Sequence, residues 1–306
     1  MRLLPSSAGF LLLTLCSVLH AAPAPMTIVP DIAYLSPDRT ETLDLYLPNR
    51  PKGAARAAAV VWIHGGGWIG GTKGEARAKE ICSTLALAGY VAVSIDYKMG
   101  RDSWPTCLLD SKNAVRFLRA HADDYGIDPD RIAVAGGSAG GHLALMVGLT
   151  AGTGRWEPSE PYRGVSDSVR CVIDMYGPTD LVHRFQTADG VRLDTLALTP
   201  ESFAAFGAGP SSSGHLAEAS PVNQPSASCP PVLVLHGKAD PLVNVRQSEA
   251  LVTLFGVRGV PHEAVYLDGV GHSFDWETWD KKPLPEDLRP LALAFLAKHL
   301  AAPGRP

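Results

Sequence analysis

The sequence predicts an α/β fold in which helices cover both faces of a mostly parallel central sheet. Apolar runs of strand length alternate along the chain with segments of helical periodicity, and this alternation is typical of such sheets. Glycine-containing turns with polar residues follow many of these runs, where parallel sheets usually carry their functional groups. Apolar residues make up 46% and charged residues 19% of the 306 residues, as expected for one globular domain over residues 23–306.

The first half of the sheet is predicted from three apolar runs and two helical patterns. The first run carries leucine at every second position from 43 to 47, which indicates a strand with one wet face. The other two are continuously apolar, as strands buried on both faces are. In the second helix, Leu108, Val115 and Leu118 fall at helical spacing, and Gly126 ends it. The expected elements are strands at 41–48, 57–64 and 90–97 and helices at 73–87 and 104–125.

The second half continues the same alternation. Turn residues at 128–131 lead into a short apolar strand, and a helix follows directly after it. The expected elements are strands at 131–136, 169–177, 230–237 and 262–267 and helices at 139–149, 244–255 and 285–300.

Two segments do not fit the alternation. Residues 151–168 form a polar loop, and residues 178–228 form a long stretch rich in Ser, Pro and Gly with a weak helical piece at 201–206. A long insertion at the carboxyl end of a sheet is more often a lid or a substrate wall than a linker. We therefore expect a lid-like insertion before the penultimate strand, within the same domain.

The N-terminus has the pattern of a secretory signal peptide. Arg2 is followed by a short apolar run at 8–15 and by small residues up to Ala22. This run is too short to span a bilayer comfortably, although an uncleaved anchor is the alternative. We expect residues 1–22 to be removed, a secreted or periplasmic protein, and no stable membrane association after cleavage.

Charge and cysteine content limit the partners. The formal net charge is −4, and the absence of a basic stripe argues against nucleic acid as a partner. The mature chain would contain Cys82, Cys107, Cys171 and Cys229, which in an exported protein permit disulfides but also suit buried free thiols. No Cys or His pattern has metal-ligand spacing, so no metal site is expected.

Ser138 is the candidate nucleophile. The segment "GGSAG" at 136–140 fits G-x-S-x-G, and it lies between a predicted buried strand and a predicted helix, which is the context of a nucleophile elbow. Gly136 and Gly140 allow a turn so tight that a side chain at either position would obstruct it. A glycine-rich phosphate loop or a plain strand–helix turn is the alternative interpretation of this segment.

A serine hydroxyl needs a base that is oriented by an acid. His272 in "DGVGHSF" follows the last predicted strand and is the candidate base. Asp240 in "HGKADPLV" is the candidate acid, because Pro241 and the next helix start hold its loop near the expected position of His272. Asp180 in "YGPTD", one strand earlier, is the alternative acid.

An acyl-transfer site also needs N–H donors that face the developing oxyanion. The segment "HGGGW" at 64–68 follows a strand and presents glycines whose main-chain N–H groups no Cβ would shield. We predict an oxyanion hole from the N–H groups of Gly66, Gly67 and Ala139, with Trp68 as the alternative to Gly67.

These motifs together resemble the α/β-hydrolase superfamily over residues 31–300. "VVWIHGGGWIGGTK", "GGSAGGHLA", "GKADPLV" and "GVGHSF" are most similar to those of bacterial feruloyl-esterase-like carboxylesterases, which border the hormone-sensitive-lipase group. The resemblance implies a Ser–His–Asp carboxylic ester hydrolase that needs no cofactor, with small-molecule or polysaccharide-linked esters as substrates. It covers feruloyl, acetylxylan and short-chain esterases as well as kynurenine formamidases, and an exported protein fits an extracellular ester best.

Substrate contacts are harder to assign. Trp68 and Trp276 are candidates for an acyl or aromatic pocket, together with Trp104 and Trp279, although core packing is the alternative for each. Two other functions stay open: a peptidase or amidase of the prolyl-oligopeptidase type, which would lack its large N-terminal domain here, and a non-catalytic binding module with a hydrolase-like fold.

Overall fold

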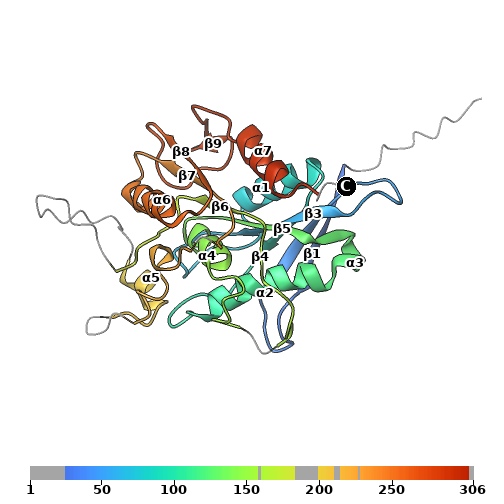
Figure 1. The fold of residues 1–306 in the computed structure, drawn as a ribbon, viewed down its shortest axis with the longest axis horizontal. Helices are drawn as coiled ribbons and strands as arrows, with labels where there is room; N and C mark the ends of the chain where they lie inside the picture. The colour runs from blue at the N-terminus through green and yellow to red at the C-terminus, as the bar shows by residue number, and fades with distance from the viewer. Residues whose placement is uncertain (1–24, 158–159, 183–198, 210–213, 227, 303–306) are drawn as a thin grey trace, which may run out of the picture.

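The central sheet has eight strands in the spatial order β1-β2-β4-β3-β5-β6-β7-β8 (Figure 1). The computed structural model describes residues 25–157, 160–182, 199–209, 214–226 and 228–302. The strands are β1 (Met26–Ala33), β2 (Thr42–Pro48), β3 (Ala57–Ile63), β4 (Val91–Ile95), β5 (Ile127–Gly137), β6 (Val172–Met175), β7 (Val232–Gly237) and β8 (His262–Leu267). Pairing is antiparallel between β1 and β2 and between β2 and β4, and parallel from β4 to β8, so the predicted fold class is confirmed.

Helices cover both faces of this sheet (Figure 1). The helices are α1 (Ala76–Leu87), α2 (Thr106–Ala120), α3 (Ala122–Tyr125), α4 (Ala139–Leu149), α5 (Pro200–Ala204), α6 (Arg246–Arg258) and α7 (Arg289–His299). Two apolar cores separate the layers: α2, α4 and α6 contribute to one, and α1 and α7 to the other. Along β3, Val61 and Ile63 enter the first core while Val60 and Trp62 enter the second, as the two-residue period of a strand requires.

The structure corrects several predicted boundaries. The edge strand β1 is mostly exposed and therefore carries no buried apolar pattern that would have predicted it. The residues of the expected turn at 128–131 lie within β5. There the pairing of β5 with β3 shifts register, between Ala57 and Ala59 of β3. The expected helix at 104–125 is interrupted at His121, which separates α2 from α3. A short hairpin, β9 (Thr278–Trp279) with β10 (Lys282–Pro283), was not predicted.

The four cysteines of the described chain are buried and free. Burial raises the pKa of the thiols of Cys107 and Cys171 to about 12, so these groups are neutral and unreactive as nucleophiles near neutral pH. The predicted signal peptide at 1–22 lies outside the described residues. Within the described ranges, no helix combines the length and the apolar character that crossing a bilayer would require.

Gly140 and Gly256 give a matched test of the packing around the elbow. A Cβ on Gly140 would overlap the carbonyl oxygens of Ile63 and His64, whereas a Cβ on Gly256 in α6 would meet nothing within 4 Å. We expect Gly140→Ala to lower the free energy of unfolding by about 3 kcal/mol, because the new Cβ would force backbone atoms of Ile63 and His64 to shift. Gly256→Ala should raise it by about 0.5 to 1 kcal/mol through helix propensity. Urea unfolding of both variants checks this, and equal effects would contradict it.

Candidate active site

Ser138 lies in the turn between β5 and α4. Its φ is 57°, a conformation that costs energy in a residue with a side chain. Its N–H donates to the carbonyl of Met175 in β6 at 2.9 Å, which helps to hold the turn. A Cβ on Gly136 would overlap the backbone of Gly140, so the two glycines permit the close approach of strand and helix that the sequence predicted.

His272 and Asp240 meet Ser138 at the carboxyl edge of the sheet. The Ser138 hydroxyl is 2.8 Å from His272 Nε2, and His272 Nδ1 is 2.6 Å from Asp240 Oδ2. Ser138 follows β5, His272 follows β8 and Asp240 follows β7, so parallel strands bring all three to one edge of the sheet. The structure therefore brings together three side chains that are far apart in the sequence, in the order expected for a nucleophile, a base and an acid.

Asp240 is held by several donors. Its Oδ1 accepts the N–H groups of Leu242 and Val243, both at 2.9 Å, and the Nε2 of His236 is 3.3 Å from its Oδ2. Burial alone would raise the pKa of Asp240, but hydrogen bonds from His236, His272 and the Val243 N–H outweigh it and lower the pKa to about 2. The carboxylate is therefore ionised at working pH. His236, the penultimate residue of β7, lies four residues before Asp240 and was not among the predicted site residues.

The alternative acid, Asp180, occupies a different place. It follows β6, where its Oδ1 accepts the N–H of Val182 at 3.0 Å and its own N–H donates to Gln247 Oε1 at 2.7 Å. These contacts order the loop after β6. The structure thus places Asp240, and not Asp180, against His272.

The loop at 64–68 lies close to Ser138. A Cβ on Gly65 would be 3.2 Å from Ser138 Cβ, and φ is positive at three successive residues: Gly66, Gly67 and Trp68. A Cβ on Gly66 would overlap the Gly70 carbonyl, so this position requires glycine. We call residues 64–68 the oxyanion loop. Ala139, the third predicted donor, is the first residue of α4, where backbone N–H groups have no partner within the helix.

The tryptophans predicted to contact substrate are buried in the structure. Trp68 is 0% and Trp276 is 1% exposed, so both side chains are core residues rather than a pocket surface. Trp104 is also buried and packs against Phe206 of the insertion. Trp279 has a role that the sequence did not reveal, because its Nε1 donates to the His272 carbonyl at 3.0 Å and so holds the loop of that histidine.

The described part of the insertion packs on the oxyanion loop. A Cβ on Gly67 would be 2.7 Å from Ser202 Oγ of α5, and Phe206 is fully buried in the same core as Trp68. The carbonyls of Ala204 and Ala205 accept N–H groups of residues 102 and 104, both at 2.9 Å. The described residues of the insertion therefore pack against this loop and the segment after it, with a short helix, α5, close to the predicted 201–206. Residues 183–198 and 210–213 lie outside the description.

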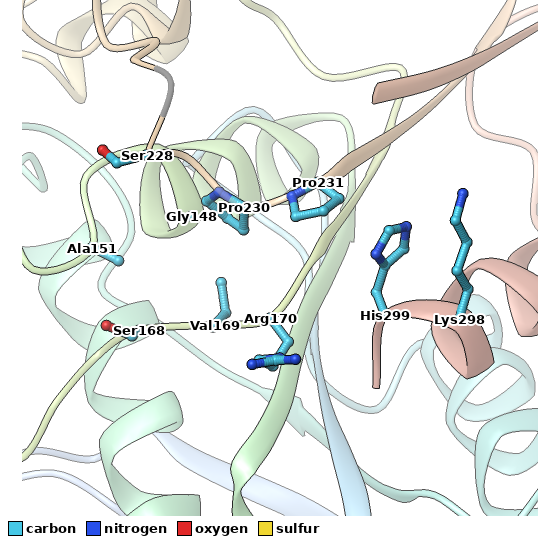
Figure 2. A pocket seen from close by; sticks show the side chains of 10 residues that line it. All are labelled: Gly148, Ala151, Ser168, Val169, Arg170, Ser228, Pro230, Pro231, Lys298 and His299. Carbon is cyan, nitrogen blue, oxygen red and sulfur yellow. The ribbon is translucent and has the colours of Figure 1, made fainter. Parts of the chain in front are cut away.

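A separate groove of about 400 Å³ lies at the opposite edge of the sheet (Figure 2). Arg170, Lys298 and His299 line it together with Pro230 and Pro231. Because Arg170 and Pro231 precede β6 and β7, this groove is at the amino ends of the strands. It includes none of the candidate active-site residues. Among the described residues, no group of three or more His, Cys, Asp or Glu side chains is arranged to hold a metal ion.

His142 should make stability depend on pH. Burial lowers the pKa of this fully buried imidazole to about 4, against an ordinary value of 6.5. As the pH falls, the unfolded chain therefore binds the proton first. The contribution of neutral His142 to the free energy of unfolding is fully present above about pH 6.5 and is lost as the pH falls toward 4. A shift of one pKa unit corresponds to about 1.4 kcal/mol, so the free energy of unfolding falls by about 3 kcal/mol over this range.

The measurement compares urea unfolding of wild type and His142→Asn at pH 7, 5.5 and 4. The wild type should lose more stability than the variant over this range, so any deficit of the variant at pH 7 should shrink at pH 4. Parallel curves for the two proteins would contradict the assignment.

Comparison with known proteins finds a matching family profile and similar curated esterases. The BD-FAE family profile matches residues 43–255. The esterase LipC of Mycobacterium tuberculosis is 32% identical over 255 residues, which cover 78% of this chain and 58% of that protein. The probable carboxylic ester hydrolase LipM of the same organism is 34% identical over 247 residues, or 80% of this chain and 56% of that protein. The chain thus spans little more than half the length of these curated relatives.

Solved structures extend the likeness to nearly the whole chain. A truncated carbohydrate esterase from gut microbiota superposes with a TM-score of 0.74 at 26% identity, covering 92% of this chain and 99% of that one. Esterase 2 of Thermogutta terrifontis, phosphorylated by paraoxon, superposes with a TM-score of 0.68 at 26% identity, covering 92% and 96%. Because the family profile matches more than half of the chain and the sheet has the strand order described above, the chain belongs to the BD-FAE family and has the α/β-hydrolase fold.

Proposed function

We propose that the protein is a serine-dependent carboxylic ester hydrolase. The observation that carries the proposal is the hydrogen-bonded series from Ser138 through His272 to Asp240, with distances of 2.8 and 2.6 Å. An alcohol becomes an effective nucleophile when an oriented imidazole accepts its proton, and this arrangement supplies both the base and its orientation. The two esterases of Mycobacterium tuberculosis and the two solved esterases support the same activity.

The proposed reaction has two halves. Ser138 Oγ attacks the ester carbonyl while His272 Nε2 takes its proton, and the resulting oxyanion accepts hydrogen bonds from the N–H groups of Gly66, Gly67 and Ala139. His272 then protonates the leaving alcohol, and an acyl-enzyme remains on Ser138. Water, deprotonated by His272, attacks this ester and releases the acid. Asp240 stays ionised throughout and stabilises the imidazolium.

For the substrate, we propose carboxylic esters with an acetyl or other short acyl group, carried by a carbohydrate, with feruloyl esters as the second candidate. The superposition on a carbohydrate esterase over 99% of its length favours the carbohydrate-linked ester. The signal-like segment at 1–22 suits a secreted or periplasmic protein that meets such material outside the cell.

A hydrolysis panel tests this function. It compares p-nitrophenyl acetate, butyrate and octanoate with methyl ferulate, acetylated xylan and an amide analogue. We expect acetate and acetylated xylan to be cleaved fastest, and the amide slowest. Preferred cleavage of the amide would favour the peptidase or amidase alternative. A chain that cleaves nothing and fails to react with a fluorophosphonate probe would favour the non-catalytic binding module.

A further inference from the structure

His142 occupies a buried position between the nucleophile helix, the oxyanion loop and the insertion. It lies one turn beyond Ser138 in α4, where its N–H donates to the Ser138 carbonyl at 3.0 Å. Its side chain is 0% exposed, and the rings of Trp68 and Phe206 pack against it edge-on. The mechanism proposed above does not use this imidazole.

The two ring nitrogens of His142 have different partners. Nδ1 is 3.2 Å from Trp68 Nε1, and Nε2 is 2.7 Å from the carbonyl oxygen of Ala219. An indole N–H can only donate and a carbonyl oxygen can only accept. Nδ1 is therefore the unprotonated acceptor, and Nε2 carries the proton. The partners fix one neutral tautomer, which links the oxyanion loop on one side to the insertion on the other.

Trp68 needs such a link because its backbone is strained. Its φ is 60°, which is unfavourable for a bulky residue and persists only when surrounding contacts hold it. Its carbonyl accepts the N–H of Gly100 at 2.8 Å, and its side chain donates to His142. Gly67, a proposed oxyanion donor, immediately precedes it. A rotation about φ of Trp68 would turn the peptide unit between Gly67 and Trp68, which carries the N–H of Trp68, the alternative donor, and adjoins the Gly67 donor.

We propose that His142 is a positioning residue that holds the oxyanion loop in register with Ser138 through the Trp68 Nε1–His142 Nδ1 hydrogen bond. This role rests on the proposed function, because it concerns donors that act on the oxyanion. Such donors stabilise the transition state more than the bound ester. Loss of the link should therefore lower kcat and leave KM nearly unchanged.

A matched pair of amide variants separates the two hydrogen bonds. In His142→Asn, the amide oxygen lies about where Nδ1 was and can still accept from Trp68. In His142→Gln, the amide nitrogen reaches the position of Nε2 and can donate to Ala219, but no acceptor remains for Trp68. We expect His142→Asn to keep kcat within about 3-fold of wild type, and His142→Gln to lose roughly 10- to 100-fold at nearly constant KM, as small misplacements of such donors do.

Trp68→Phe completes the test, since it removes the indole N–H and keeps the aromatic packing. It should lose kcat to the same extent as His142→Gln, and the double variant should lose no more than either single one, because both break one hydrogen bond. The rate at which a fluorophosphonate labels Ser138 should rank the variants in the same order as kcat does. Thermal unfolding of each variant shows whether a loss of kcat exceeds what reduced folding explains.

Distinct outcomes overturn the two proposals. The positioning role is wrong, while the hydrolase function stands, if wild type hydrolyses esters and His142→Asn and His142→Gln lose kcat equally. The same conclusion follows if the losses of kcat in His142→Gln and Trp68→Phe are additive in the double variant. If wild type neither hydrolyses any ester nor reacts with the probe, the proposed function fails and the positioning role fails with it. A wild type that labels without hydrolysing still tests the role through the labelling rates.

Discussion

Replacement of Ser138 by alanine is expected to lower kcat for p-nitrophenyl acetate by roughly 10⁴-fold or more, since loss of a catalytic serine removes the acyl-enzyme route entirely. The Ser138 hydroxyl is the group that lies 2.8 Å from His272 Nε2, the nitrogen that would accept its proton. The fold should survive, because alanine tolerates the 57° φ of this position about as well as serine does.

The control for this variant is Ser168→Ala. Ser168 is exposed and lines the groove at the opposite edge of the sheet, so its loss should leave kcat within about 2-fold of wild type, as surface changes usually do. Fluorophosphonate labelling should disappear in Ser138→Ala and persist in Ser168→Ala. Wild-type turnover in Ser138→Ala, with an unchanged thermal unfolding curve, would show that the nucleophile is assigned wrongly.

The second large effect is expected for Asp240→Asn, which should lower kcat by roughly 10³- to 10⁴-fold near neutral pH. Asp240 Oδ2 accepts the Nδ1 proton of His272 at 2.6 Å and so leaves Nε2 free to accept from Ser138. An asparagine amide that presents its NH₂ group there favours the opposite tautomer, in which Nε2 carries a proton and cannot act as a base. Steady-state kinetics at constant pH measure the loss, with KM expected to change little.

Asp180→Asn is the matched control, because both carboxylates were candidates for the acid. The Oδ1 of Asp180 accepts the N–H of Val182, and an asparagine oxygen can accept the same bond. We expect kcat within a few-fold of wild type in this variant. A larger loss in Asp180→Asn than in Asp240→Asn would reverse the assignment of the acid.

Local sequence patterns were sufficient for the fold class and for the residues that meet at the sheet edge. The boundaries of α4 and β8 agree with the predicted 139–149 and 262–267. Ser138, Asp240 and His272 were found because each follows a strand in a recognisable turn, and parallel strands bring such turns together. The edge strand β1 was missed because Pro30 and Asp31 interrupt its apolar residues, and its formation depends on pairing with β2.

The supporting contacts could not be found in this way. His142 lies inside an apolar helix, yet its partners are 74 and 77 residues away along the chain. Trp68 was expected beside the substrate and is instead a buried donor to that histidine. Trp279, which holds the loop of His272, belongs to a hairpin too short to leave a sequence pattern.

The sequence alone therefore determined the alternation of strands and helices and the candidate residues at the strand ends, because hydrophobic periodicity and glycine turns are properties of short segments. Only the tertiary structure decided which tautomer His142 adopts and which tryptophans are buried. These depend on side chains that approach one another through packing of distant segments, and no local pattern encodes the distance between them.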